Sequence, residues 1–185
     1  MMTARTRILE RILPAVAPVE EADWDDVYRR ELPRIFNFFR YRVADGATAE
    51  DLASLTFEKA WRGRHQYRND EAAFSTWLFT IARNVAVDHW RRRRREVPLE
   101  EAPEPAIEAT PEDDLVRRAD FHRLSSILDE LPERERELVA LKYGAEATNR
   151  AIAQITGLTE TNVGTILHRT VHALRTRWFG KDENS

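Results

Sequence analysis

The sequence predicts an all-α protein made of two small helical domains joined by a flexible, acidic and proline-rich linker. Apolar residues recur at three- and four-residue steps through most of the chain, which is the spacing of one helix face. Signals of β-strands are nearly absent, with no alternating β-branched runs and no Asn-Gly turns. We place the first domain at 23–95, the linker at 96–114 and the second domain at 115–180, with 1–22 as an N-terminal tail.

The linker, residues 96–114, carries eight acidic groups, no basic group and half of the chain's eight prolines. Proline restricts its own backbone and that of the residue before it, and the glutamates repel one another, so an extended tether is expected. The net charge of −3 therefore conceals a first domain of net +4 and a stretch of net +1 over 115–185. We expect the two domains to move independently, with protease cutting between Val97 and Asp114.

The first domain is predicted to hold about four helices. Apolar residues of the first recur at helical steps: Trp24, Val27, Tyr28, Leu32, Ile35, Phe36 and Phe39. Pro33 is expected to kink or restart that helix. Thr48 is expected to cap the next helix, with Asp51 at its third position as in a capping box. After a polar loop at 67–72, a third long helix carries an apolar side made of Phe74, Trp77, Leu78, Ile81 and Val85.

The second domain is predicted to hold a helix around 115–131, another from Pro132, and then a helix-turn-helix. Pro132 suits a first helical turn, where its missing N–H costs nothing. Thr148 is expected to cap a short helix, Gly157 to supply the turn, and a long helix to follow at about 159–178.

The last helix has two contrasting sides when it is drawn at about 100° per residue. One side is expected to pack on the domain: Val163, Leu167, Thr170, Leu174 and Trp178. The other holds Thr161, Thr165, His168, Arg169 and His172, short and basic polar groups that suit base edges and phosphates. A merely solvated face is the alternative, but the capped helix and glycine turn before it favour DNA.

His168 and His172 stand four residues apart, as metal ligands on a helix often do. A metalloprotease helix needs glutamate directly after the first histidine, and Arg169 stands there instead. Since no third ligand is near in the sequence, we expect no metal site.

The arginine run at 91–95 follows Trp90 directly. Five adjacent cations need solvent or a polyanion, and a solvated helix end, favoured by the macrodipole, is the plain interpretation. Nucleic acid is favoured because Trp77, Phe79 and Trp90 precede the run and are candidates to stack on bases, although some of these aromatics are expected in the core.

Several classes of function are excluded by what the sequence lacks. Cysteine is absent, which removes disulfides, thiolate catalysis and cysteine-bound zinc. We find no phosphate-binding glycine loop or nucleophile motif, so neither an enzyme nor a cofactor is expected. No apolar run approaches the roughly 18 residues of a membrane helix, and the N-terminus lacks a secretory signal, so we expect a cytoplasmic protein without membrane insertion.

Two stretches of the first domain, "AEDLASLTFEKAWRG" and "FSTWLFTIARNVAVDHWRRRRR", closely resemble region 2 of extracytoplasmic-function (ECF) sigma factors. "LPERERELVALKYGAEATNRAIAQITGLTETNVGTILHRTVHAL" resembles their region 4. The resemblance covers roughly residues 24 to 178, and the order, the spacing and the acidic tether all fit. It implies a sigma factor that binds core RNA polymerase, recognises the −10 and −35 promoter elements and directs transcription initiation. The implied partners are core polymerase, promoter DNA that is single-stranded at −10 and duplex at −35, and, as a candidate, an anti-sigma factor.

The resemblance also implies site residues. The polymerase-docking residues are Asp51, Leu52, Ser54, Leu55, Glu58 and Lys59. The −10 residues are Arg68, Asn69, Asp70, Phe74, Trp77, Phe79, Asn84, Arg91, Arg92, Arg93, Arg94 and Arg95. The −35 residues are Thr148, Thr161, Asn162, Thr165, His168, Arg169 and His172.

Some positions depart from the family pattern. Ser54 and Leu55 stand where glutamine and glutamate are usual, which would leave Leu55 as an exposed apolar group. The loop "RNDEAAF" is one residue longer than usual, so −10 preference does not transfer. Gly164 and Ile166 replace basic residues, so the second domain should bind DNA feebly unless polymerase tethers it.

Two other readings of the sequence stay open. A dimeric helix-turn-helix regulator would explain the second domain but not the first domain or the arginine run. A protein-interaction module whose DNA contacts have decayed would explain Gly164 and Ile166.

Overall fold

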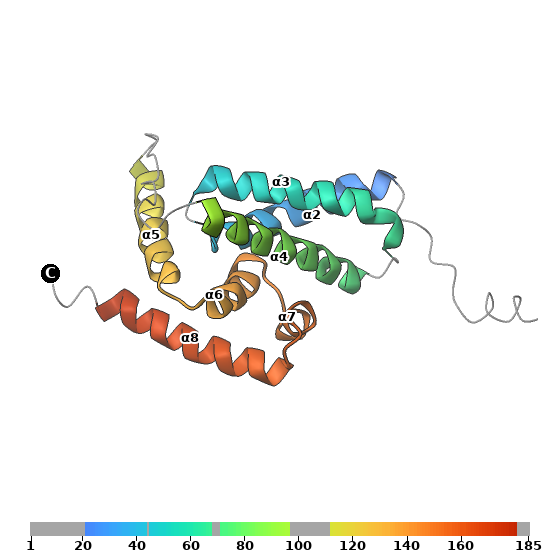
Figure 1. The fold of residues 1–185 in the computed structure, drawn as a ribbon. Helices are drawn as coiled ribbons and strands as arrows, with labels where there is room; N and C mark the ends of the chain where they lie inside the picture. The colour runs from blue at the N-terminus through green and yellow to red at the C-terminus, as the bar shows by residue number, and fades with distance from the viewer. Residues whose placement is uncertain (1–20, 44, 68–70, 97–111, 181–185) are drawn as a thin grey trace, which may run out of the picture.

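The computed structural model describes residues 21–43, 45–67, 71–96 and 112–180, and over these ranges the protein is all-α, without strands (Figure 1). The N-terminal unit consists of α2 (Glu21–Arg40), α3 (Gly46–Gly63), the 3₁₀ turn η1 (Arg64–Gln66) and α4 (Glu71–Glu96). The C-terminal unit consists of α5 (Glu112–Asp129), α6 (Glu133–Val139), the π turn η2 (Ala140–Gly144), α7 (Asn149–Thr156) and α8 (Glu160–Gly180). The predicted all-α class with two helical units is confirmed.

In the N-terminal unit, the three long helices pack side by side around aromatic side chains. Phe38 and Phe39 of α2 and Phe79 of α4 are buried at its centre, with ring centroids 5.2 and 5.9 Å from Phe38. The expected fourth helix does not occur in the described ranges. α2 does not restart at Pro33, because this proline lies on the exposed side of the helix, where water can solvate the carbonyl that loses its donor.

The start of α3 differs from the sequence-based prediction. Asp45 is the N-cap, and its carboxylate accepts a hydrogen bond from the Thr48 backbone N–H at 2.7 Å. The helix therefore begins two residues before Thr48, and the capping box with Asp51 does not form. An aspartate at the N-cap satisfies an orphan N–H at least as well as a threonine does.

The C-terminal unit follows the prediction closely. Thr148 caps α7 by accepting a hydrogen bond from the Ala151 N–H at 3.1 Å, and Gly157 adopts φ 75° in the turn. Thr159 caps α8 in the same way, since its hydroxyl accepts from the Asn162 N–H. Glycine is favoured at position 157 because other residues rarely adopt a left-handed backbone.

The two units share one hydrophobic core, which contradicts the expectation that they move independently. η2 packs on α2 and α7 packs on α4, so the C-terminal unit lies along one side of the N-terminal unit (Figure 1). The proposed tether falls largely on residues 97–111, which lie outside the described residues. The sequence showed the charge of that segment but not the complementary surfaces that bring the units together.

Candidate nucleic-acid interface

α3 turns one face to the core and the other away from it, on the opposite side of the molecule from α8 (Figure 1). Asp51, Ser54 and Glu58 are exposed on the outer face. Two docking residues need correction. Leu52 is only 6% exposed, because it follows the buried Ala49 by three residues on the same stripe, and Leu55 is half-buried against the core instead of standing free.

Among the residues expected to read the −10 strand, some are accessible on the surface and others are buried in the core. Arg68, Asn69 and Asp70 lie outside the described residues, whereas Asn84 is exposed and Trp77 is half-buried on α4. Phe74 and Phe79 are 3% and 1% exposed, so neither can stack on a base in this structure. The expectation for these two residues is corrected: both are core residues.

Phe74 belongs to an aromatic cluster at the N-terminal end of α4. Its ring lies 5.8 Å from Trp24, 4.9 Å from Tyr67 and 5.5 Å from Trp77, measured between centroids. Trp61 joins the cluster against Trp24 and stays 38% exposed, with the Arg64 guanidinium 3.8 Å from its ring centroid. Sequence reasoning missed this cation–π pair, although "WRGR" places a tryptophan three residues before an arginine at a helix end.

The arginine run continues α4 to Glu96, and the side chains of Arg91, Arg92 and Arg93 are exposed. Arg91 donates to Asp88 at 3.1 Å, and Arg93 lies 5.8 Å from the ring of the half-buried Trp90. The helix includes Arg94 and Arg95, whose side chains lie outside the described residues. The run thus forms a cationic helix end with one local carboxylate among the described side chains.

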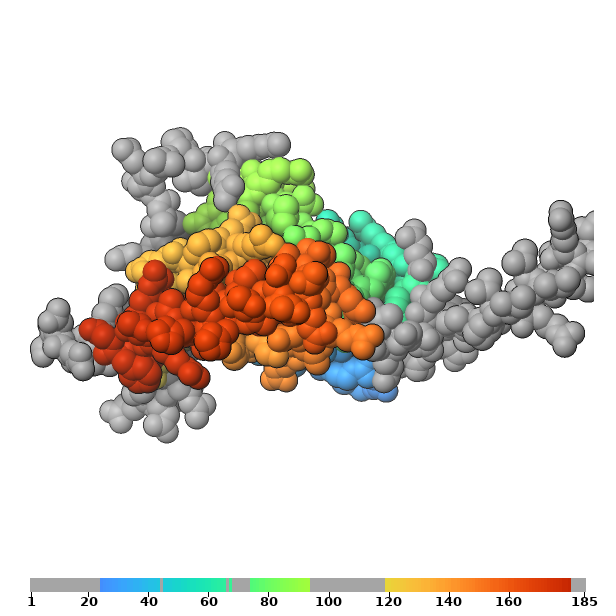
Figure 2. Space-filling view, turned by 90° about the horizontal axis from the view of Figure 1, so that it is seen from below, coloured from blue at the N-terminus to red at the C-terminus, as the bar shows by residue number. Residues whose placement is uncertain are grey.

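α8 has the two faces that the helical wheel predicts. Val163, Leu167 and Thr170 are buried, and Leu174 and Trp178 are half-buried. The opposite face is exposed at every position proposed for DNA: Thr161, Asn162, Thr165, His168, Arg169 and His172. Figure 2 shows α8 running across one face of the molecule, in front of the other helices. Thr148, at the start of α7, is exposed too.

Some of these polar groups already have partners. The Thr165 hydroxyl donates to the Thr161 carbonyl at 3.0 Å, and Arg169 lies 3.4 Å from the Glu135 carboxylate. Ile166 is half-buried against the core and Gly164 lies beside Asn149, so Ile166 is a packing residue and not a bare position on the DNA face.

A cleft beside α8 brings further cationic groups to the same side. It has a volume of about 340 Å³ and is lined by residues that include Lys142, His168, His172 and Arg175. Lys142 comes from η2, 26 residues before His168, so sequence reasoning had no reason to join them. This cleft suits an anionic nucleic-acid backbone better than a metal ion. The cationic Lys142 and Arg175 side chains would repel a metal ion and attract phosphates.

Within the described residues, no group of three or more histidines, cysteines and carboxylates is close enough to hold a metal ion. No helix in those ranges is both long and apolar enough to cross a membrane.

Profiles of known families match both units of the chain. Sigma-70 region 2 matches residues 27–96, and sigma-70 region 4 matches residues 121–174.

Full-length relatives match across both units. The ECF RNA polymerase sigma factor BldN of Streptomyces coelicolor is 30% identical over 91% of this chain, which spans 64% of the length of BldN. The RNA polymerase sigma factor YlaC of Bacillus subtilis is 30% identical, and the match covers 78% of this chain and 86% of YlaC. The fold resembles that of the sigma factor RpoE, solved in complex with the anti-sigma factor NepR from Bartonella quintana. The TM-score is 0.64 at 24% identity, over 84% of this chain and 96% of RpoE.

Proposed function

This chain is a member of the extracytoplasmic-function group of sigma-70 factors, and we propose which of its surfaces hold polymerase, the −10 strand and the −35 duplex. It is a transcription initiation factor and not an enzyme. As a sigma factor it binds core RNA polymerase and promoter DNA and directs initiation.

We propose that α8 enters the major groove of the −35 element. The observation that carries this proposal is the uninterrupted exposed polar face of α8, opposite a buried apolar face and behind a capped helix and a left-handed glycine turn. Thr165 and His168 would contact base edges, and Arg169 would contact bases or phosphates. Lys142 and Arg175 join the proposal as phosphate contacts, since they line the cleft beside His168 and His172.

For the −10 element, we propose Asn84 and Trp77 on α4, together with the loop at 68–70, as the surface that holds the unstacked strand. The exposed Trp61–Arg64 pair extends this surface, because a tryptophan face under a guanidinium is a platform on which a base can stack. Arg91, Arg92 and Arg93 would contact duplex phosphates nearby. Arg94 and Arg95 keep the same proposed role.

Polymerase docking is proposed for the outer face of α3, through Asp51, Ser54 and Glu58, with Leu55 as a partly buried apolar centre. Lys59 keeps this proposed role at the edge of that face, where its ammonium lies 3.9 Å from the Asp88 carboxylate of α4. We assign these roles to a promoter-melting domain at 23–95 and a −35 domain at 115–180. A cytoplasmic location and a partner of the anti-sigma class are further proposals.

Transcription in vitro with core polymerase, followed by mapping of start sites, tests the function. Thr165→Ala and Thr176→Ala form a matched pair, because both hydroxyls are exposed on α8 and both donate to the carbonyl four residues before. Thr165→Ala should weaken −35 binding by about 1–3 kcal/mol, roughly ten- to a hundredfold, whereas Thr176→Ala lies three turns further along and should not. Equal losses from the two variants would contradict the proposed groove contact.

A further inference from the structure

Glu135 of α6 contacts two neighbouring residues of α8, one on its surface and one in its core. The Oε1 atom of Glu135 lies 3.4 Å from the Arg169 guanidinium, and its Oε2 atom accepts a hydrogen bond from the Thr170 hydroxyl at 3.1 Å. Thr170 is 1% exposed, whereas the Arg169 side chain is 71% exposed. One carboxylate therefore connects a cation on the proposed DNA face of α8 to a residue buried beneath it.

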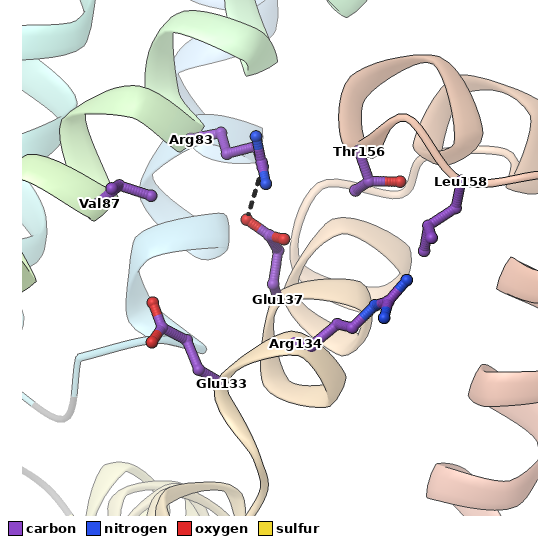
Figure 3. A pocket seen from close by; sticks show the side chains of 7 residues that line it. All are labelled: Arg83, Val87, Glu133, Arg134, Glu137, Thr156 and Leu158. Atoms are coloured by element: carbon purple, nitrogen blue, oxygen red, sulfur yellow. Dashed lines mark hydrogen bonds and ion pairs between the residues drawn. The ribbon is translucent and has the colours of Figure 1, made fainter.

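The other two glutamates of α6 have their partners in the N-terminal unit. Glu137 accepts from Arg83 at 3.0 Å, and Glu133 lies 3.6 Å from Arg42. Figure 3 shows Glu133, Glu137 and Arg83 around a cavity of about 420 Å³ between the two units. Two residues turn a helix by about 200°, so Glu135 lies on the other side of α6 and meets α8.

A buried donor fixes the position of the Glu135 carboxylate. The Thr170 side chain is packed on the core side of α8 and cannot follow a carboxylate that moves away. The Glu135 side chain is itself only 24% exposed. The carboxylate is therefore the fixed partner of the ion pair, and it determines where the guanidinium of the long, exposed Arg169 side chain lies on the face of α8.

Arg169 can contact a base while it stays beside Glu135. A guanidinium carries several N–H donors on different edges of one plane, and the contact with Glu135 is made through Nη2. A bidentate contact to O6 and N7 of guanine needs two further donors on another edge. The carboxylate and a guanine can thus bind the same guanidinium together.

A fixed guanidinium favours a base contact over phosphate contacts. A base is contacted in one geometry, so a partner that orders the arginine beforehand removes part of the rotamer entropy lost on binding. Phosphates line both strands and can be reached from many side-chain positions, so ordering helps such contacts little. A phosphate out of reach of the fixed side chain requires Arg169 to leave Glu135, which costs up to about fivefold in affinity.

We propose that Glu135 is a positioning residue for −35 recognition, which orients Arg169 to read a guanine and restrains it from contacting phosphates elsewhere. Glu135 then raises affinity for the matched element and lowers affinity for unrelated DNA. This inference rests on the proposed function, since it requires α8 to lie in the major groove.

Glu135→Gln tests the proposal in the full-length chain bound to core polymerase. Glutamine keeps an oxygen that can accept from Thr170, but it removes the charge that holds Arg169. Affinity is measured for a promoter found by start-site mapping and for a copy with a scrambled −35 element. The variant should bind the matched promoter about three- to tenfold more weakly, and the scrambled copy up to about threefold more tightly with a steeper salt dependence.

Glu130→Gln is the matched control. Glu130 lies 3.6 Å from Arg177, which is two turns further along α8 than Arg169, so this substitution removes the same charge beside another arginine of the same helix. It should change both affinities by similar factors and leave their ratio within twofold of the parent. In an Arg169→Ala background, Glu135→Gln should leave the ratio unchanged too.

The directions of the two effects decide the outcome. Similar rises on both duplexes would mean that Glu135 acts through net charge alone, and similar losses would mean that it only supports the fold. Either result, or no change, overturns the inference while the proposed function stands. If Arg169→Ala weakens binding to neither duplex, the proposed contact of α8 with the groove itself fails.

Selection from duplexes randomised over the −35 element gives an independent measurement. The parent chain with core polymerase should enrich guanine at the position that Arg169 reads. Glu135→Gln should lose most of that enrichment and keep the preferences at other positions, a pattern that a general loss of stability does not produce. An unchanged preference at every position in the variant would show that Glu135 does not position Arg169.

Discussion

At the scale of single residues, the charges that matter most to the folded chain are those with partners in another helix. Glu137 of α6 holds Arg83 of α4 and Arg42, which follows the end of α2. Glu31 of α2, 1% exposed, accepts from Ser75 of α4 at 3.1 Å and from Arg34 of its own helix at 2.7 Å. Burial lowers the pKa of Arg42, because a cation loses hydration there, while the nearby Glu137 works in the opposite direction.

A double-mutant cycle should measure the Arg83–Glu137 contact. Arg83→Ala and Glu137→Ala should couple by about 1–3 kcal/mol in urea unfolding, because the pair is largely withdrawn from solvent. The Arg29–Asp26 pair, with side chains 74% and 80% exposed, should couple by less than about 0.5 kcal/mol. Similar coupling for both pairs would mean that Arg83 and Glu137 are solvated in solution.

Asp45 should make stability depend on pH. Hydrogen bonds from the Thr48 side chain and backbone hold the Asp45 pKa below its usual 3.8 in the folded state. The ionised cap therefore stabilises the fold above the unfolded-state pKa, and this contribution is lost as pH falls through the folded-state value. Asp45→Ala should lower the free energy of unfolding by about 1 kcal/mol at pH 7, and by less at a pH below the folded-state pKa of Asp45. Asp45→Asn keeps a cap that does not titrate, so the stability of this variant itself should not change across that titration.

At the scale of secondary-structure elements, the helical period of α8 and of α4 places packing residues on one face and the proposed binding residues on another. α8 buries Val163 and Leu167 and exposes Thr165 between them, as well as His168 and Arg169 directly after them. α4 buries Leu78, Phe79 and Val85, turns Arg83 to the other unit and leaves Asn84 exposed. Rotations of about 100° per residue thus give neighbouring residues different tasks.

Gly164→Lys should strengthen DNA binding by α8 mainly through phosphates. Its Cβ would meet only the Asn149 amide nitrogen at 3.6 Å, an ordinary contact, and the helix loses a glycine that costs close to 1 kcal/mol. Affinity for matched and scrambled −35 duplexes should rise by similar factors, with a steeper salt dependence. Gly180→Lys adds the same charge at the end of α8 and should change affinity less. Weaker binding by Gly164→Lys would show that this face does not meet DNA.

Replacing Arg91–Arg95 by alanine should weaken binding to different promoters by similar factors and flatten its salt dependence. Phosphate contacts carry little sequence information, so promoter preference should survive, and so should binding to core polymerase. Salt titrations on two unrelated promoters provide the measurement. A loss confined to one promoter would show that some of these arginines read bases or DNA shape.

At the scale of the whole molecule, two units of modest size share one core. Glutamates of α6 in the C-terminal unit form ion pairs with Arg42, which follows α2, and with Arg83 of α4. The linker then joins two units that already recognise one another.

Cleavage of the linker should leave the two units assembled. After a specific protease site is placed within 97–111 and cut, the two fragments should co-elute in gel filtration, since the interface and not the linker holds them. In Gly144→Ala the fragments should separate, because a Cβ atom at this position would stand 2.8 Å from the Asn37 carbonyl oxygen of α2. Separate elution of the cut parent chain would restore the expectation of independent domains.

The amino-acid sequence by itself determined the helices, the caps at Thr148 and Gly157, the two faces of α8 and membership of the sigma-factor family. These features are local, or depend on spacing along one helix, so period and residue type suffice to predict them. Only the tertiary structure decided that Leu52, Phe74 and Phe79 are core, that Lys142 joins His168 at one cleft, and that Glu137 and Gly144 lie where the two units meet. Each of these depends on which surfaces meet in space, and no pattern within a single helix records the partner on the other side.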